Sequence, residues 1–132
     1  MFESKLNFRV RYCETDQMGV VHHGNYAQYF EMGRIEWLRN FNLSYKKMEE
    51  DGIGLPVVNL QTNFLKPLYY DDELTLITEL KEPPTAKIIF TYKLYRDQEL
   101  MSTGETTLVF VDMDRNRPIK APSYFLDLLN SY

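Results

Sequence analysis

The segment from residue 25 to residue 41 reads NYAQYFEMGRIEWLRNF and carries one continuous helical pattern. Aromatic residues and one glycine recur in it at positions i, i+3, i+4, i+7, i+11 and i+15, namely Tyr26, Tyr29, Phe30, Gly33, Trp37 and Phe41. Side chains at these spacings share one face of an α-helix. The segment therefore predicts a long helix whose aromatic face is covered by other parts of the chain. Gly33 lowers helix stability by about 1 kcal/mol relative to alanine, so its place in this stripe indicates that another backbone approaches closely.

The ends of this helix and the segments around it have their own patterns. Asn25, with Gln28 three residues later, predicts a capping box. A short helix is expected from Ser44 as N-cap to Asp51, and Gly52 suits the left-handed residue that ends it. Strands are expected where apolar and polar residues alternate, at residues 6–12, 58–64, 74–80, 88–94 and 101–111. A terminal helix is expected at residues 125–132.

The order of these elements predicts the α+β class. One long helix has to lie on a sheet, and four consecutive strands predict an antiparallel meander. One helix covers only one face, so strand edges remain and we expect dimerisation through such an edge. The 132 residues fit a single domain, residues 1–132, with 44% hydrophobic residues to form a core.

Composition excludes several classes of function. The net charge of −4 argues against a nucleic-acid partner. No apolar run is long enough to span a membrane, and the first residues lack the basic-then-apolar layout of a secretory signal. We therefore expect a cytoplasmic protein, and Cys13, the single cysteine, cannot form an internal disulfide.

The loop before the long helix, residues 12–26, reads YCETDQMGVVHHGNY. Val20 and Val21 are apolar residues in a polar loop, so we expect the loop to pack inward and to hold Asp16 near the interior. The loop runs into a helix N-terminus, where backbone N–H groups lack partners and the helix dipole is positive. Such a terminus can stabilise an oxyanion that forms on a carbonyl. A carboxylate beside unpaired amides predicts an acyl-transfer site.

This loop and its surroundings closely resemble the signature of the hotdog-fold acyl-CoA thioesterases, the group that includes 4-hydroxybenzoyl-CoA thioesterase and the Tol-Pal-associated thioesterases. The resemblance covers about Leu6 to Val111. The matching segments are Glu14-Thr15-Asp16, Gly19-Val20-Val21, His23-Gly24-Asn25-Tyr26, Phe30-Glu31, residues 34–39, Phe64-Leu65-Lys66-Pro67 and Asp71-Asp72-Glu73-Leu74.

The resemblance implies a hotdog fold, in which an antiparallel sheet wraps around the long helix. It also implies a homodimer or dimer of dimers, with sheets joined edge to edge and each active site at the interface. The implied reaction is hydrolysis of an acyl-CoA or acyl carrier protein thioester without metal or organic cofactor. Asp16 would act as nucleophile or general base, and the amide around His23 would bind the thioester carbonyl. The substrate would contact Gly19, Val20, Val21, His22, Gly24, Asn25, Tyr26 and Glu31.

Other interpretations stay open. Asp16 is also a common turn residue, and Glu31 is either a polar group of the site or a surface partner of Arg34. Tyr26 and Tyr29 fit core packing, but they also fit the wall of an acyl tunnel. The chain departs from the family pattern at Met18, at His22, which is more often aromatic, and at Pro83-Pro84-Thr85, where basic residues often contact nucleotide phosphates. A hotdog hydratase or dehydratase and a non-catalytic acyl-thioester binding module are the alternative functions.

Overall fold

The computed structural model describes residues 2–131. In chain order its elements are β1 (Phe2–Arg9), the 3₁₀ turn η1 (Tyr12–Glu14), α1 (Asn25–Asn40), α2 (Tyr45–Glu50), β2 (Ile53–Gly54), β3 (Val57–Phe64), β4 (Glu73–Leu80), β5 (Lys87–Arg96), β6 (Glu99–Val109), β7 (Val111–Asp112), β8 (Arg117–Pro118) and α3 (Ser123–Asn130). Tyr132, the last residue of the expected terminal helix, lies outside the described residues. Within residues 2–131, no helix is both long and apolar enough to cross a membrane.

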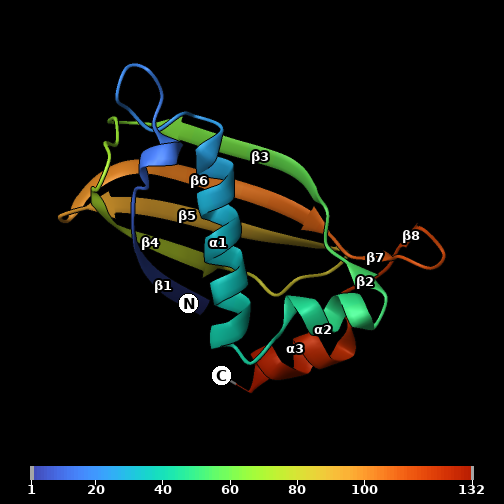
Figure 1. The fold of residues 1–132 in the computed structure, drawn as a ribbon. Helices are drawn as coiled ribbons and strands as arrows, with labels where there is room; N and C mark the ends of the chain where they lie inside the picture. Colours follow the sequence, from blue (N-terminus) through green and yellow to red (C-terminus); the bar gives the residue numbers. More distant parts are fainter. Residues whose placement is uncertain (1, 132) are drawn as a thin grey trace.

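Five strands form one antiparallel sheet in the order β1-β4-β5-β6-β3, and α1 crosses one face of it (Figure 1). A small sheet of β2, β7 and β8 continues from one end, close to α2 and α3. This arrangement confirms the predicted α+β class and the hotdog fold.

The predicted aromatic stripe of α1 is confirmed as the side that packs on the sheet. The stripe residues from Tyr26 to Trp37 are buried, and the ring of Phe30 stacks on Tyr92 of β5 with centroids 4.4 Å apart. A Cβ on Gly33 would lie 2.7 Å from Cδ2 of Leu76 on β4. The glycine is therefore required because the helix and the sheet meet there without space for a side chain.

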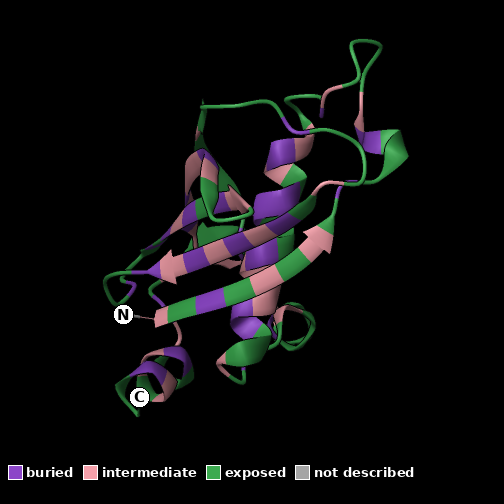
Figure 2. Cartoon of the chain, turned by 90° about the vertical axis from the view of Figure 1, so that its left-hand side faces the viewer, coloured by how far each residue is buried: buried purple, intermediate pink, exposed green. Residues whose placement is uncertain are grey.

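The strand pattern is confirmed for β4 and β5, where every second residue is buried. Figure 2 shows this alternation along the strand beside β1. The first strand is shifted: it spans Phe2–Arg9, and Tyr12 belongs to η1 and is 77% exposed. The strand stops early because Glu14 binds the Arg11 backbone N–H and closes a turn there.

The predicted four-strand meander is wrong at its first strand. β4, β5 and β6 pair in succession, but β3 pairs with β6 at the far edge of the sheet. β1 occupies the position beside β4 that the meander would have given to β3. β3 therefore leaves one of its edges unpaired within residues 2–131.

β3 is also uncovered on its faces. All of its residues except the half-buried Thr62 are exposed, although four of them are large apolar residues, Val57, Val58, Leu60 and Phe64. α1 packs mainly on β1 and β4 instead. The expected half-burial of this strand is therefore not met within a single chain.

Candidate functional site

One buried carboxylate, that of Glu14, fixes the loop between β1 and α1. Its side chain is 6% exposed and accepts hydrogen bonds from the Arg11 backbone N–H (2.7 Å), the Arg11 Nε (3.0 Å) and the Tyr29 hydroxyl (2.8 Å). Its backbone carbonyl accepts from the His22 N–H (2.9 Å) and the Asn25 side-chain amide (2.7 Å). Burial raises the pKa of Tyr29, and the hydrogen bond to Glu14 raises it further. Glu14 thus joins both ends of the loop to the start of α1.

Asp16 begins a tight turn and is exposed in the single chain. Its Oδ1 accepts from the backbone N–H groups of Met18 (2.8 Å) and Val20 (3.4 Å), and neither bond uses Oδ2. Gly19 adopts a φ of +82° in this turn, which favours glycine. Val21 is buried as expected, but the expectation that Asp16 lies near the interior is wrong for the single chain. The Asp16 carboxylate instead binds the backbone of its own exposed turn.

At the entry to α1, a backbone amide lacks an acceptor among the described residues 2–131. The Gly24 N–H donates to Nδ1 of His22 (3.1 Å), the Asn25 N–H to the His22 carbonyl (2.9 Å), and the Tyr26 N–H to the His23 carbonyl (3.2 Å). Within residues 2–131, the N–H of His23 has no hydrogen-bond acceptor. The predicted capping box is wrong, because Gly24 precedes the helix and the Asn25 side chain bonds to the loop. The unpaired amide lies at the position where an oxyanion donor is expected.

An open cavity of about 290 Å³ lies against this part of the loop. Four predicted site residues line it, Val20, Val21, His23 and Tyr26. Its other wall is residues 64–67, the end of β3 and the segment after it. The Tyr26 ring meets that of Phe64 edge-on, with centroids 4.8 Å apart, and burial raises the pKa of Tyr26. The cavity therefore joins the helix entry to the free edge of the sheet.

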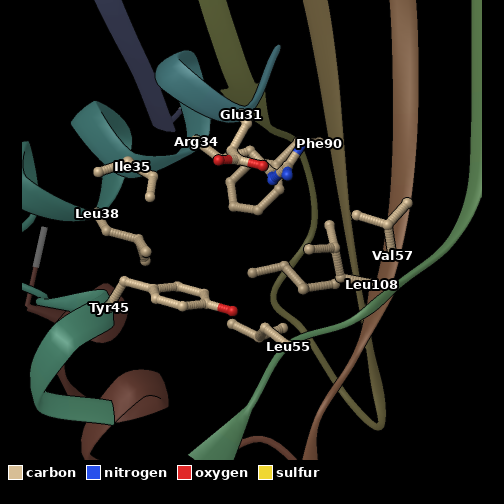
Figure 3. Close-up of a pocket in the computed structure, with 10 residues that line it drawn as sticks. Glu31, Arg34, Ile35, Leu38, Tyr45, Leu55, Val57, Phe90 and Leu108 are labelled. Carbon is tan, nitrogen blue, oxygen red and sulfur yellow. The ribbon is translucent and has the colours of Figure 1, made fainter. Parts of the chain in front are cut away.

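Glu31 lies elsewhere, at a second cavity of about 200 Å³ between α1, α2 and the sheet. Figure 3 shows Glu31 and Arg34 on one side of this cavity and Tyr45 on the opposite side. Within residues 2–131, Glu31 forms no ion pair with Arg34, whose Nη1 donates to the Tyr92 hydroxyl (3.3 Å). The surface-pair interpretation of Glu31 is therefore wrong. Tyr29 is fully buried and bound to Glu14, so it contributes to the core rather than to a tunnel wall.

Sequence reasoning missed the structural role of Glu14 and the second cavity. An acceptor side chain three residues after Arg11 is the spacing of a capping box, and this signal could have identified Glu14. The second cavity has no local signal, because α1, α2, β5 and β6 all contribute to it.

Comparisons with known proteins show the family to which the chain is similar. The chain matches the model of the thioesterase-like superfamily over residues 10–129. An acyl-CoA thioesterase from Haemophilus influenzae is 31% identical over 125 residues, which cover 92% of this chain and 92% of that protein. An acyl-acyl carrier protein thioesterase from Arabidopsis thaliana is 28% identical, over 90% of this chain and 63% of that protein. The crystal structure of a DHNA-CoA thioesterase from Staphylococcus aureus has a TM-score of 0.92 at 34% identity, covering 100% of this chain and 89% of that one.

These similarities extend over nearly all of the fold, including the loop, the long helix and the five-stranded sheet. The chain belongs to the thioesterase-like superfamily.

Proposed function

We propose that this protein hydrolyses acyl-CoA thioesters, with Asp16 as nucleophile or general base and the His23 backbone N–H as the donor to the thioester carbonyl. The observation that carries the proposal is the His23 backbone N–H, which has no acceptor within residues 2–131 and belongs to a residue that lines a cavity within the thioesterase signature. Family membership supports the reaction class, and the acyl-CoA and acyl carrier protein thioesterases among the relatives support the substrate class.

The chemistry needs few groups. A thiol leaves as its thiolate without a dedicated acid, since its pKa is roughly 8.5. The main barrier is the charge that develops on the carbonyl oxygen, and one preorganised donor lowers such a barrier by about 3 kcal/mol. The Asp16 Oδ2, which the turn does not use, is the oxygen that attacks the carbonyl carbon or removes a proton from water.

The protein acts as a homodimer, or as a dimer of such dimers, through the free edge of β3. This edge has unpaired backbone groups and exposed apolar side chains, which a second copy would cover. Because the cavity beside His23 ends at residues 64–67 of the same edge, pairing would place the site at the interface. The Asp16 turn, exposed in one chain, then faces the partner.

The test is release of free thiol from acyl-CoAs by the wild type, Asp16→Asn and the control Asp127→Asn on the exposed side of α3. We expect Asp16→Asn to lose at least ~100-fold in kcat/KM, and Asp127→Asn to match the wild type. Equal rates for Asp16→Asn and wild type would refute the role of Asp16. Tight acyl-CoA binding without thiol release by any of the three proteins would favour the binding-module function instead.

A further inference from the structure

The connector between β3 and β4, residues 65–72, supports the loop before α1. In the sheet, β5 and β6 lie between β3 and β4, so the connector has to cross one end of the sheet (Figure 1). There it contacts the loop: Val20 forms an isolated antiparallel bridge with Tyr69. Next to this bridge, the Val21 N–H donates to the Leu68 carbonyl (2.8 Å). One side of the loop is therefore held by the backbone of the connector.

The bridge at Val20 lies directly beside the turn that Asp16 begins. The Asp16 N–H donates to the Val20 carbonyl (2.8 Å), and the Val20 N–H donates to the Asp16 Oδ1 (3.4 Å). The backbone of Val20 thus holds both the main chain and the side chain of Asp16. A shift of the connector at Tyr69 consequently moves the Asp16 carboxylate.

The carboxylate of Asp72 fixes the connector at Tyr69. Its Oδ2 accepts from the Tyr69 backbone N–H (2.8 Å) and from Nη1 of Arg96, the last residue of β5 (2.9 Å). The Asp72 backbone carbonyl accepts from the Val10 N–H (3.0 Å), just after β1. The side chains of Asp72 and Arg96 are only 20% and 25% exposed. This ion pair is therefore partly shielded from water and is stronger than an exposed pair.

The connector needs such a contact because little else holds its second half. Between residues 65 and 72, all of which the structure describes, the chain forms neither a helix nor a regular strand. The fully buried Leu68 side chain anchors its middle. After it, Asp71 has a left-handed φ of +69°, a conformation that costs a residue other than glycine about 1–2 kcal/mol. Such a conformation persists only where neighbouring contacts hold it, and the Asp72 carboxylate supplies two of them.

We propose that Asp72 and Arg96 are positioning residues for Asp16. Through the backbone of Tyr69 and Val20, they hold the Asp16 carboxylate in the orientation in which it acts on the thioester. The inference rests on the proposed function. Neither Asp72 nor Arg96 lines the cavity at the entry to α1, so their loss should slow the chemical step without weakening substrate binding.

Steady-state kinetics test this role, with whichever of acetyl-, hexanoyl-, benzoyl- and palmitoyl-CoA the wild type cleaves fastest. We expect Asp72→Ala to lower kcat by ~10- to 100-fold, because a misplacement of about 1 Å has an effect of this size. KM should stay within about threefold of the wild-type value, since the binding groups are intact. Arg9→Met, which removes an exposed ion pair with Asp71 and Glu73, is the matched control and should keep kcat within about twofold. An unchanged kcat in Asp72→Ala would overturn the inference.

A double-mutant cycle distinguishes positioning of Asp16 from a general loss of structure. In the Asp16→Asn background, Asp72→Ala should change the remaining rate of thiol release by less than about twofold, because the carboxylate that it positions is already absent. A further loss of ~10-fold in that background would show that the effect does not pass through Asp16, and the positioning role would be refuted. If Asp72→Ala does not fold, as checked by urea denaturation, Asp72→Asn takes its place in the cycle.

Arg96 gives a graded version of the test. Arg96→Met leaves the Tyr69 N–H bonded to Asp72, so we expect a smaller loss of kcat than in Asp72→Ala. Arg96→Lys should regain at least half of the wild-type kcat, because an ammonium can replace the single contact from Nη1. If Arg96→Lys is no more active than Arg96→Met, the ion pair has no positioning role.

These results separate the two proposals. Wild-type activity of Asp16→Asn would contradict the proposed function itself. A slow Asp16→Asn together with a fully active Asp72→Ala would overturn only the positioning role.

Discussion

At the scale of single residues, the shape of the loop depends on Glu14. Glu14→Ala leaves the Tyr29 hydroxyl and the Arg11 backbone N–H without their buried acceptor. We expect the free energy of unfolding to fall by about 2–4 kcal/mol, measured by urea denaturation. Glu82→Ala, in an exposed loop, should change it by less than ~0.5 kcal/mol. Equal stability of Glu14→Ala and Glu82→Ala would contradict a structural role of the Glu14 carboxylate.

Tyr29 gives stability a dependence on alkaline pH. Burial and the contact with Glu14 raise the pKa of Tyr29 in the folded chain above the unfolded value of about 10. Its contribution is complete below about pH 10 and is lost as the pH rises towards the folded pKa. Tyr29→Phe should therefore lose less stability than the wild type between about pH 9 and about pH 11. Urea denaturation at both pH values measures this, with exposed Tyr70→Phe as control. An equal loss in Tyr29→Phe and wild type would contradict the raised pKa.

The sequence predicted which residues gather at the loop but not what each one touches. Val20, Val21, His23 and Tyr26 do line one cavity. The exposure of Asp16 was not predictable, because it results from hydrogen bonds within its own turn. Glu31 is separated from the loop because α1 runs away from it. The motif residues alone do not give the direction of this helix.

At the scale of secondary-structure elements, the contact between α1 and β4 depends on Gly33. Gly33→Ala improves helix propensity by about 1 kcal/mol, but its Cβ would press on Leu76 and Thr78. We expect a net loss of about 1–3 kcal/mol, measured by urea denaturation. Gln28→Ala, on the exposed side of the same helix, should be neutral or slightly stabilising. A stabilised Gly33→Ala would show that the helix and the sheet have room at this point.

Elements whose signals are local were predictable from the sequence. Ser44 caps α2 by accepting from the Lys47 N–H (3.2 Å), and Gly52 has the left-handed φ of +80°. The predicted capping box at Asn25 was wrong because the Asn25 side-chain amide donates to the Glu14 backbone carbonyl, which is distant in sequence. The predicted end of the first strand at Tyr12 was wrong for a similar reason. The hydrogen bond from the Arg11 backbone N–H to Glu14 ends β1, and strand periodicity does not reveal this contact.

For the molecule as a whole, β3 is the surface through which we propose that two copies pair. We expect Leu60→Lys to convert the dimer into monomers, because it places a charge in the apolar edge. Sedimentation velocity measures the change. Ile89→Lys is the matched control: Ile89 is 45% exposed, as is Leu60, but it lies on an inner strand of the sheet. Loss of the dimer in Ile89→Lys but not in Leu60→Lys would place the interface elsewhere.

The position of β3 was the main feature of the fold that the sequence did not predict. Apolar and polar residues alternate in β3 in the same way whether its own chain or another copy covers the strand. Periodicity therefore predicts that the strand is buried, but not which chain covers it. Adjacency in sequence predicted pairing with β4, but β1 already occupies that edge. Long-range pairing therefore decided the sheet order, while local patterns decided the elements.

The proposed function depends on the Asp16 carboxylate acting on a thioester held by the His23 amide. A single-turnover measurement with enzyme in excess over one acyl-CoA isolates that chemical step from binding and product release. We expect Asp16→Asn still to bind the acyl-CoA, with a rate constant for thiol release at least ~100-fold below that of the wild type. Equal single-turnover rate constants for the two proteins would contradict it.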